Sequence, residues 1–367
     1  MLQNILSLAK KFISIKSTSD NKESLKKILD LAVSQLKGHT IERFECNGID
    51  SALIHNKKKR PKRFKVILNG HLDVIPGKEH QYEPEIKGNR LYGVGSMDMK
   101  ANIVCLIKAF KEVAGRVSYP LGLQLVTDEQ IGGFNGTKYQ VEKGIRADFV
   151  IAAEATNFDI VNQAKGVLHG KVFVKGKTAH GAYPWRGDNA IRKMNEFLNI
   201  LQKKYLIPEH EAWMTTVNIS RIETTNQAFN KIPDNCTALL DIRFIPEEAE
   251  VIERNIKQLL PKGCRLDIIV NEPALFTDRN NKFIKLLKNT TQQVISKNIR
   301  LRGAHGTSDA RHFSSVGCAG IEFGPLGGGI GSDNEWVDIP SLNKYYQILK
   351  MFLLAAELGK FNLEVQL

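Results

Sequence analysis

Apolar positions along the chain change period several times, and each change marks the border of a predicted element. Near the start, apolar groups recur three and four positions apart, which is typical of helices that bury one face. Further on, short runs of consecutive apolar residues indicate strands buried on both sides. We therefore predict helices at 4–15, 22–36 and 101–113, and strands at 41–46, 52–54, 66–68, 90–92, 121–126 and 149–153.

The pattern changes at about residue 166 and changes back at about residue 273. Between these points we predict, in order, a strand at 167–175, a helix at 189–204, strands at 215–223 and 238–244, a helix at 247–260 and a strand at 265–270. A β-α-β-β-α-β order is typical of a small α+β unit whose helices cover an antiparallel sheet. Helix and strand alternation then resumes at 283–295, 320–323 and 341–358.

The order of elements predicts two domains. Residues 1–165 and 273–367 form an α/β domain in which helices flank a central mixed sheet, and residues 166–272 are a smaller α+β insert. The chain has 367 residues, 42% hydrophobic and 25% charged, which is ordinary globular composition and enough for two hydrophobic cores.

Cellular location is suggested by what the sequence lacks. The first residues read as a surface helix, because they have no long apolar segment followed by a small-residue cleavage site. No stretch approaches the roughly 20 apolar residues of a membrane span, so we expect no membrane partner. The five cysteines include no close pair, which suits a reducing compartment. We predict a cytoplasmic protein.

The charge is strongly basic, at a formal net charge of +13. Residues 57–63 form a dense basic run, but the run lies between two strand-like segments and has no interleaved aromatic residues. We interpret it as a solvated loop and expect no nucleic-acid partner. An excess of positive charge also attracts small anions, so an anionic substrate is expected.

Polar side chains follow apolar runs at four places. His71 ends one run, and Asp98, Glu129 and Glu154 come at or soon after the ends of three others. Because an α/β sheet gathers its ligands at the carboxyl ends of its strands, we expect these side chains to converge. Imidazole and carboxylate bind metals, and Asp73 follows the histidine closely enough to orient its ring. The sequence therefore predicts a metal site at this edge of the sheet.

Ordered motifs along nearly the whole chain carry a resemblance to one family. They occupy residues 15–19, 71–73, 95–100, 128–133, 154, 176–180 and 306–311. On these motifs the chain resembles the zinc-dependent amidohydrolase and exopeptidase family that includes acetylornithine deacetylase, succinyl-diaminopimelate desuccinylase, aminoacylase and glutamate carboxypeptidase. The resemblance implies that the α/β domain is catalytic and that the insert is a lid or dimerisation domain.

The resemblance implies a two-zinc site. His71 and Glu154 would hold the first zinc, Asp98 would bridge both ions, and Asp73 would support His71. Glu129 would be the general base that takes a proton from the attacking water. Cobalt and manganese are possible substitutes for zinc.

The resemblance also implies residues that handle the substrate. His180, which the insert carries, would stabilise the oxyanion, in family members often at the active site of a partner subunit. Arg311 and Arg243 would bind a substrate carboxylate, and Asn230 would lie nearby. A homodimer formed through the insert is therefore expected.

Two positions depart from the family pattern, and both belong to the second zinc. Gln130 stands where the family has an acid, and Gly331 stands where it has a histidine. An amide oxygen is a poor substitute for a carboxylate, and glycine offers no ligand. We expect one well-held zinc, from His71, Asp98 and Glu154, and a second that is weak or absent.

Three hypotheses remain open on these residues. The chain is an active one-metal hydrolase that cleaves the amide bond of an N-acyl amino acid or short peptide, or it is a catalytically impaired relative that binds a metal or an acidic ligand. In the third, His305, His312 or Asp333 replaces the missing ligands. The sequence does not distinguish acetyl, succinyl and peptidyl substrates.

Overall fold

A computed structural model describes residues 2–357, which form two compact units. Unit 1 comprises the chain up to Gln163, Leu275–Arg302 and the residues from Ser308 on; unit 2 comprises Ala164–Ala274 and Gly303–Thr307. The predicted borders at 165 and 273 differ from these limits by two residues. The prediction had left Gly303–Thr307 in the larger domain.

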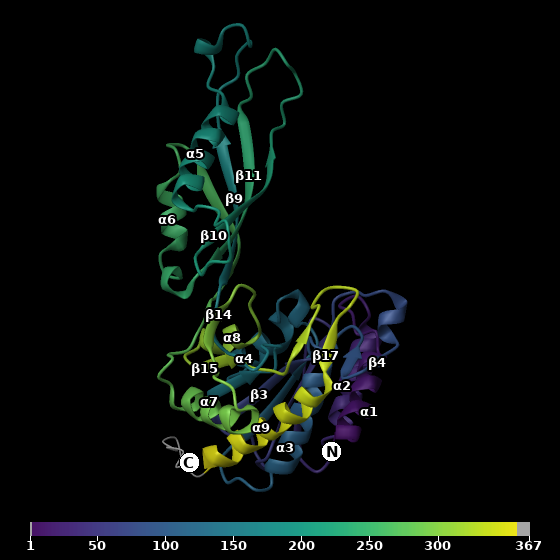
Figure 1. The fold of residues 1–367 in the computed structure, drawn as a ribbon. Coiled ribbons are helices and arrows are strands. Elements are labelled where there is room, and N and C mark those ends of the chain that lie inside the picture. The colour runs from purple at the N-terminus through teal and green to yellow at the C-terminus, as the bar shows by residue number, and fades with distance from the viewer. Residues whose placement is uncertain (1, 358–367) are drawn as a thin grey trace. The chain divides into compact units, whose positions relative to one another are not determined.

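The centre of unit 1 is a nine-stranded mixed sheet (Figure 1). Four neighbouring strands of it, β6, β3, β7 and β15, are parallel. They are buried along nearly their whole length, which explains their continuous apolar sequences. The strands, in sheet order, are β1 (Thr40–Cys46), β2 (Ile49–His55), β6 (Leu121–Val126), β3 (Phe64–His71), β7 (Ala147–Ala152), β15 (Ala319–Glu322), β8 (Ile160–Ala164) and β13 (Leu275–Phe276), and β14 (Leu301–Ala304) pairs with β8.

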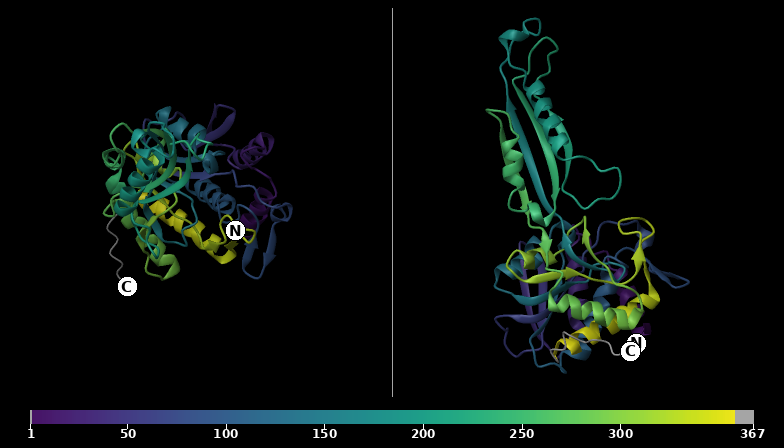
Figure 2. Two further views of the ribbon diagram at one scale, coloured as in Figure 1. Left: turned by 90° about the horizontal axis from the view of Figure 1, so that it is seen from above. Right: turned by 60° about the vertical axis from the view of Figure 1, so that its left-hand side comes forward.

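Helices cover both faces of this sheet. Val66 and Leu68 of β3 belong to a core shared with the first set of helices, whereas Ile67 packs on the opposite face with the second set. Helices α7 and α9 of the first set lie side by side (Figure 2). The first set is α1 (Leu2–Ile13), α2 (Lys22–Ser34), α3 (Lys100–Val113), α7 (Lys282–Ile295) and α9 (Ile339–Glu357); the second is α4 (Tyr139–Glu142) and α8 (Ala310–Ser314).

The predicted helices are present with borders shifted by a few residues. Asn21 and Asn281 cap α2 and α7, because each side chain accepts a hydrogen bond from a backbone N–H of the first turn. The last residue of the predicted 341–358 helix lies outside the described residues. Within residues 2–357, no helix combines the length and apolarity needed to cross a bilayer.

A second, four-stranded sheet of unit 1 corrects one prediction. It has the order β16 (Gly327–Gly328), β17 (Trp336–Asp338), β5 (Arg90–Tyr92) and β4 (Glu85–Lys87). We expected 90–92 to be a strand that delivers Asp98 in the same way as the strands before His71 and Glu154. Instead β5 belongs to this separate sheet, and Asp98 lies in the loop directly before α3.

Unit 2 is an antiparallel four-stranded sheet, and its α5 and α6 share one core with it (Figure 1). The predicted β-α-β-β-α-β order is observed, with strands in the order β10-β11-β9-β12. The predicted helix at 247–260 is shorter than expected, because its first residues form a 3₁₀ turn at Pro246–Glu248. The elements are β9 (Gly166–Lys175), α5 (Ala190–Lys204), β10 (Thr216–Glu223), β11 (Asn235–Phe244), α6 (Ile252–Gln258) and β12 (Arg265–Glu272).

Candidate metal centre

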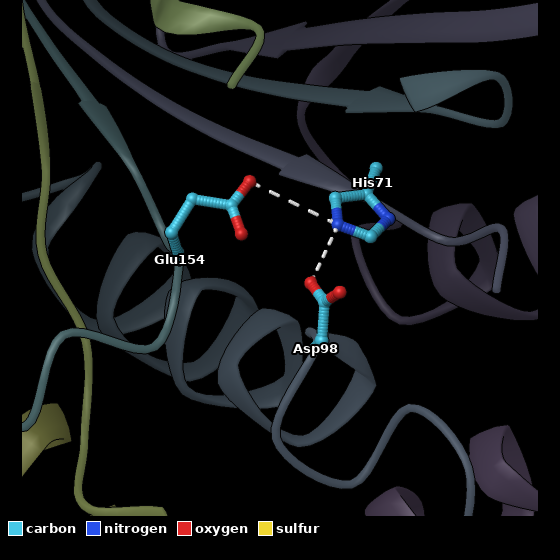
Figure 3. A group of neighbouring side chains, drawn as sticks. All are labelled: His71, Asp98 and Glu154. Carbon is cyan, nitrogen blue, oxygen red and sulfur yellow. Dashed lines mark hydrogen bonds and ion pairs between the residues drawn. The ribbon is translucent and has the colours of Figure 1, made fainter. Parts of the chain in front are cut away.

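Three side chains of unit 1 converge on one point (Figure 3). His71 Nε2 lies 3.1 Å from Asp98 Oδ1 and 3.9 Å from Glu154 Oε1, and one ligand atom from each residue lies within 4.8 Å of the others. All three were predicted as metal ligands. Among residues 2–357 this is the only group of three or more His, Cys, Asp or Glu side chains with such spacing.

Strand register brings two of these residues together. Strands β3 and β7 are parallel neighbours, and Asn69 is paired with Ala152. His71 and Glu154 each come two residues later, so they leave the sheet at the same level of its carboxyl edge. Parallel strands present their ligands at this edge, as the sequence predicted.

Asp73 holds His71 differently from the expectation. The ring atom Nδ1 is 3.0 Å from the backbone oxygen of Asp73 and 3.5 Å from its carboxylate. The carboxylate instead accepts hydrogen bonds from the backbone N–H groups of Glu129 (3.2 Å) and Gln130 (2.8 Å). Asp73 therefore fixes both the imidazole and the turn that follows β6.

Glu129 lies on that turn, a 3₁₀ segment at Glu129–Ile131. Its Oε2 is 3.9 Å from His71 Nε2, which puts the predicted base beside the predicted ligands. Burial, with help from neighbouring carboxylates, raises the pKa of Glu129 to about 8. Such a carboxylate can accept a proton near neutral pH.

The donor set fits one divalent cation. Burial raises the pKa of Glu154 well above its usual value, and its buried Oε1 has no hydrogen-bond partner. Burial disfavours a charged His71, but the carboxylates of Asp73 and Asp98 outweigh this and raise its pKa well above the usual value. A crowded set of buried acids and one imidazole is stabilised by a cation, and three protein ligands are typical of catalytic zinc sites.

Gln130 and Gly331, at the two positions predicted to lack ligands for a second cation, offer no carboxylate or imidazole. Gln130 Nε2 donates a hydrogen bond to Asp98 Oδ2 over 3.1 Å, so the amide presents an N–H group to the carboxylate that would bridge two ions. Gly331 has a φ of +71°, and a Cβ placed there would meet only Ile75, at 3.7 Å. Among residues 2–357, only the Ile75 side chain comes within 4 Å of this Cβ position.

None of the three alternative ligands joins the group around His71. His305 Nε2 lies 3.2 Å from Glu211, within unit 2. His312 Nε2 lies 3.0 Å from the Gly132 carbonyl oxygen, and Asp333 forms an ion pair with Lys78. Each is engaged by another partner.

The loop that carries Asp98 is held by Glu335. One carboxylate oxygen of Glu335 accepts hydrogen bonds from the N–H groups of Met97 (2.8 Å) and Asp98 (3.0 Å), and the other accepts from Gly95 (3.1 Å). Glu335 is buried, which raises its pKa to about 7. This support comes from the turn that contains Gly331.

A buried polar network beneath the Glu129 turn was not predicted. Thr137 Oγ1 donates to Asp309 over 2.6 Å, and Asn69 Nδ2 donates to Gln124 over 2.8 Å and contacts Thr137 at 3.3 Å. Gln124 in turn donates to Gln140 over 2.9 Å. Polar residues at 69 and 124 inside apolar strands are the one sequence signal that could have indicated it.

Arg311 is buried, unlike an open carboxylate-binding residue. Its guanidinium donates to the carbonyl oxygens of Gly132 (2.6 Å) and Ser308 (3.0 Å). Because Gly132 follows the Glu129 turn, Arg311 ties this turn to the segment before α8. Its predicted contact with a substrate carboxylate stays a prediction.

The other predicted substrate residues belong to unit 2. His180 forms an isolated β-bridge with Lys231, and the N–H of Gly181 donates to the Asn230 carbonyl over 2.7 Å, so His180 and Asn230 lie on neighbouring segments. Arg243 on β11 forms an ion pair with Asp241 at 2.8 Å. The roles of all three with a substrate stay predictions.

A mixed α/β sheet with a histidine and two acids at its carboxyl edge, a further acid beside them and a small α+β insert define the class of metal-dependent hydrolases. Comparison with known proteins narrows this class. Residues 67–355 match Peptidase family M20/M25/M40, and the chain belongs to this family, whose members hydrolyse amide bonds.

Relatives and solved structures agree with this assignment. Succinyl-diaminopimelate desuccinylases of Sulfurimonas denitrificans and Coxiella burnetii are each 26% identical, over 94% and 96% of this chain and 97% and 100% of their own length. The fold is similar to that of aminopeptidase PepT from Bacillus cereus, with a TM-score of 0.79 at 18% identity over 98% and 99% of the chains. It is also similar to Bacillus subtilis YXEP, described as a dinuclear metal-binding peptidase, with a TM-score of 0.69 at 13% identity over 97% and 98% of the chains.

Proposed function

We propose that the protein is a hydrolase that uses a single divalent ion, zinc in the first place, to cleave the amide bond of a small carboxylate-bearing substrate. The substrate is an N-acyl amino acid or a short peptide. The observation that carries this proposal is the convergence of His71, Asp98 and Glu154, with Glu129 3.9 Å from the same imidazole nitrogen.

The chain's own residues divide the work. A divalent ion at His71, Asp98 and Glu154 supplies Lewis-acid polarisation of the amide carbonyl and makes water more acidic. Glu129 accepts the proton of the attacking water and passes it to the leaving nitrogen. His180 donates a hydrogen bond to the developing oxyanion. Arg243, Arg311 and Asn230 orient the substrate, and the basic surface favours anions.

The proposal of one ion, rather than two, depends on Gln130 and Gly331. The amide of Gln130 faces Asp98 as a hydrogen-bond donor, and a donor repels a cation at that position. Gly331 supplies no ligand atom. The same two residues favour the alternative, a catalytically impaired relative that binds a metal or an acidic ligand without turnover.

Metal counting together with a substrate panel distinguishes the one-ion hydrolase from the impaired relative. Wild type, Glu129→Ala and the double variant Gln130→Glu with Gly331→His are loaded with zinc and assayed on N-acetyl and N-succinyl amino acids and on dipeptides. We expect one zinc per chain and turnover in wild type, one zinc without turnover in Glu129→Ala, and a second zinc in the double variant. If wild type turns over no substrate of the panel and the double variant does, the protein is the catalytically impaired relative.

We propose further that the protein is a cytoplasmic homodimer formed through unit 2. Support comes from exposed apolar side chains there: Ile191 and Ile200 on α5 are 44% and 47% exposed, and Trp185 is 75% exposed. The described cysteines are all free. Sedimentation velocity is expected to give a dimer for wild type and a monomer for Ile200→Glu, with Ile86→Glu in unit 1 as the control.

A further inference from the structure

A recess in unit 1 borders the turn that contains Gly331. Its volume is about 270 Å³, and its lining includes Ile75, Pro76, Val94 and Gly331. For comparison, an apolar cavity of about 150 Å³ accommodates benzene. The recess therefore has room for a large amino-acid side chain.

The recess is adjacent to the candidate metal centre. Glu335 lines it, and the same Glu335 carboxylate accepts the backbone hydrogen bond of Asp98 at 3.0 Å. Ile75, on another wall, follows Asp73 by two residues. Glu335 therefore connects the lining of the recess to the loop that carries Asp98.

The walls of the recess are fixed by side-chain bonds between two loops. Gln81, which is only 6% exposed, accepts a hydrogen bond from the N–H of Lys78 (2.8 Å) and donates one to the carbonyl of Ser332 (3.2 Å). Lys78 and Asp333 form an ion pair between the same two loops. This bonding makes the recess a built feature rather than an accidental gap.

The charges at the recess already have partners. The Glu335 carboxylate accepts three backbone hydrogen bonds, and Lys78 is paired with Asp333. The remaining lining is mixed: Ile75, Pro76 and Val94 are apolar, and the amide of Gln81 is bonded to the carbonyl of Ser332. An uncharged side chain suits such a recess better than a charged one, because a charge would be desolvated without a free partner.

We propose that this recess is a specificity subsite that binds an aliphatic or aromatic side chain next to the scissile amide. Gly331 keeps part of this space open, since a Cβ there would come within 3.7 Å of the Ile75 side chain. This inference rests on the proposed function for the identity of the substrate. The binding of the side chain itself can be measured without turnover.

Calorimetric titration of zinc-loaded protein with product-like ligands tests the proposal. One series is glycine, alanine, leucine and phenylalanine, which represent the leaving-group side of the amide. The other is acetate, 4-methylpentanoate and 3-phenylpropanoate, which represent the acyl side. In one of the two series we expect the ligand with the large side chain to bind about tenfold or more tightly than the smallest one, as burial of such a side chain implies.

Three variants make this test specific. Gly331→Asn partly fills the recess with a residue that tolerates a positive φ, and it is expected to reduce the preference to less than about threefold. Gly88→Asn is the matched control, because Gly88 also has a positive φ and nothing lies within 4 Å of its added Cβ. Ile75→Ala removes part of the wall at a partly exposed position and is expected to weaken binding of the large ligand with zinc content unchanged.

The outcomes separate this inference from the proposed function. Equal binding of small and large ligands in both series, or an unchanged preference in both Gly331→Asn and Ile75→Ala, overturns the subsite. If the protein prefers large ligands, the variants abolish this preference and no amide is hydrolysed, the subsite is supported and the proposed function is contradicted. If hydrolysis does not depend on side-chain size and small and large ligands bind equally, the proposed function is supported and the subsite is contradicted.

Discussion

His71 is the residue around which the acids of the candidate centre gather. Its Nε2 faces Asp98, Glu129 and Glu154 within 3.9 Å, while its Nδ1 faces Asp73. Without a cation, protons must neutralise part of this cluster, and a bound divalent ion displaces them. Metal affinity is therefore expected to rise with pH.

The replacement Glu154→Gln tests the ligand set directly. It keeps the shape of the side chain but removes its charge, so zinc affinity is expected to fall about 100-fold or more. Dialysis against a zinc buffer followed by elemental analysis measures this. Asp159→Asn, also a buried carboxylate of unit 1 but outside the ligand group, should keep its zinc; equal loss in both variants would contradict the assignment.

His312 makes stability depend on pH. Burial, aided by the positive charge of Arg311, lowers the pKa of His312 to about 3. Below pH 6.5 the His312 imidazole binds a proton in the unfolded chain but not in the folded one. The contribution of a neutral His312 to the free energy of unfolding is therefore complete above pH 6.5 and is lost as the pH falls toward 3. At pH 5 this effect lowers the free energy of unfolding by about 2 kcal/mol relative to pH 7.

Urea unfolding of wild type and His312→Gln at several pH values measures this dependence. The variant is expected to lose less stability than wild type between pH 6.5 and 5. His210→Gln, at an exposed position, serves as the control and should follow the wild-type curve. Identical slopes for wild type and His312→Gln would show that His312 is not held neutral.

The ligand residues could be predicted because each follows an apolar run or a family motif, and strand register does the rest. The bonds of Gln130 and Arg311 could not. Gln130 was interpreted as a poor ligand, but its hydrogen bond to Asp98 depends on where the turn places the two side chains, which the sequence does not show. The burial of Arg311 is decided by the packing of α8, which lies far from Gly132 in the sequence.

At the scale of elements, the turn after β6 is held by side chains from distant parts of unit 1. The Asp73 carboxylate accepts hydrogen bonds from its backbone at Glu129 and Gln130, and Arg311 donates to the Gly132 carbonyl. In the segment after the turn, Thr137 donates to Asp309. A base must be held in position to act on a substrate, and these contacts provide the rigidity.

Thr137→Val tests the network below this turn. The change is nearly isosteric but leaves the buried Asp309 carboxylate without its hydroxyl donor, which is expected to cost about 1–3 kcal/mol of unfolding free energy. Thr290→Val is the matched control, because its hydroxyl bonds only to carbonyls of its own helix. Denaturant titration should show a clearly smaller loss for the control; equal losses would contradict a special role for the network.

The long helices, six of the nine strands of the central sheet and all four strands of the unit 2 sheet follow from the sequence pattern, with borders shifted by up to about five residues. Strands β8, β13 and β14 were not predicted. The small sheet did not follow, because strands of two or three residues such as β16 and β17 are too short to show a period. The strand at 90–92 was predicted correctly, but its expected place in the central sheet was wrong, because its partner strand, Trp336–Asp338, lies far along the chain.

At the scale of the whole molecule, each unit has a hydrophobic core of its own. Phe283 is buried in unit 1 and Phe197 in unit 2. Domains with separate cores can unfold in separate steps. We therefore expect two calorimetric transitions, of which zinc raises only the one that belongs to unit 1.

Core substitutions assign these transitions. Phe197→Ala is expected to cost unit 2 about 3–5 kcal/mol and to lower one transition, and Phe283→Ala should lower the other, zinc-sensitive one by a similar free energy. A single transition that both variants lower equally, and that zinc raises as a whole, would show that the units unfold together.

The way the chain enters and leaves the insert has a consequence for how such proteins can diversify. Strands β8 and β13, which precede and follow most of unit 2, are neighbours in the central sheet, and the backbone N–H of Thr277 donates to the Asn162 carbonyl over 2.8 Å. Adjacent strands lie about 4.8 Å apart, so the chain leaves and re-enters the central sheet at two neighbouring points. An insert of another size or fold could therefore replace unit 2 without changing the order of the strands that position the candidate metal ligands.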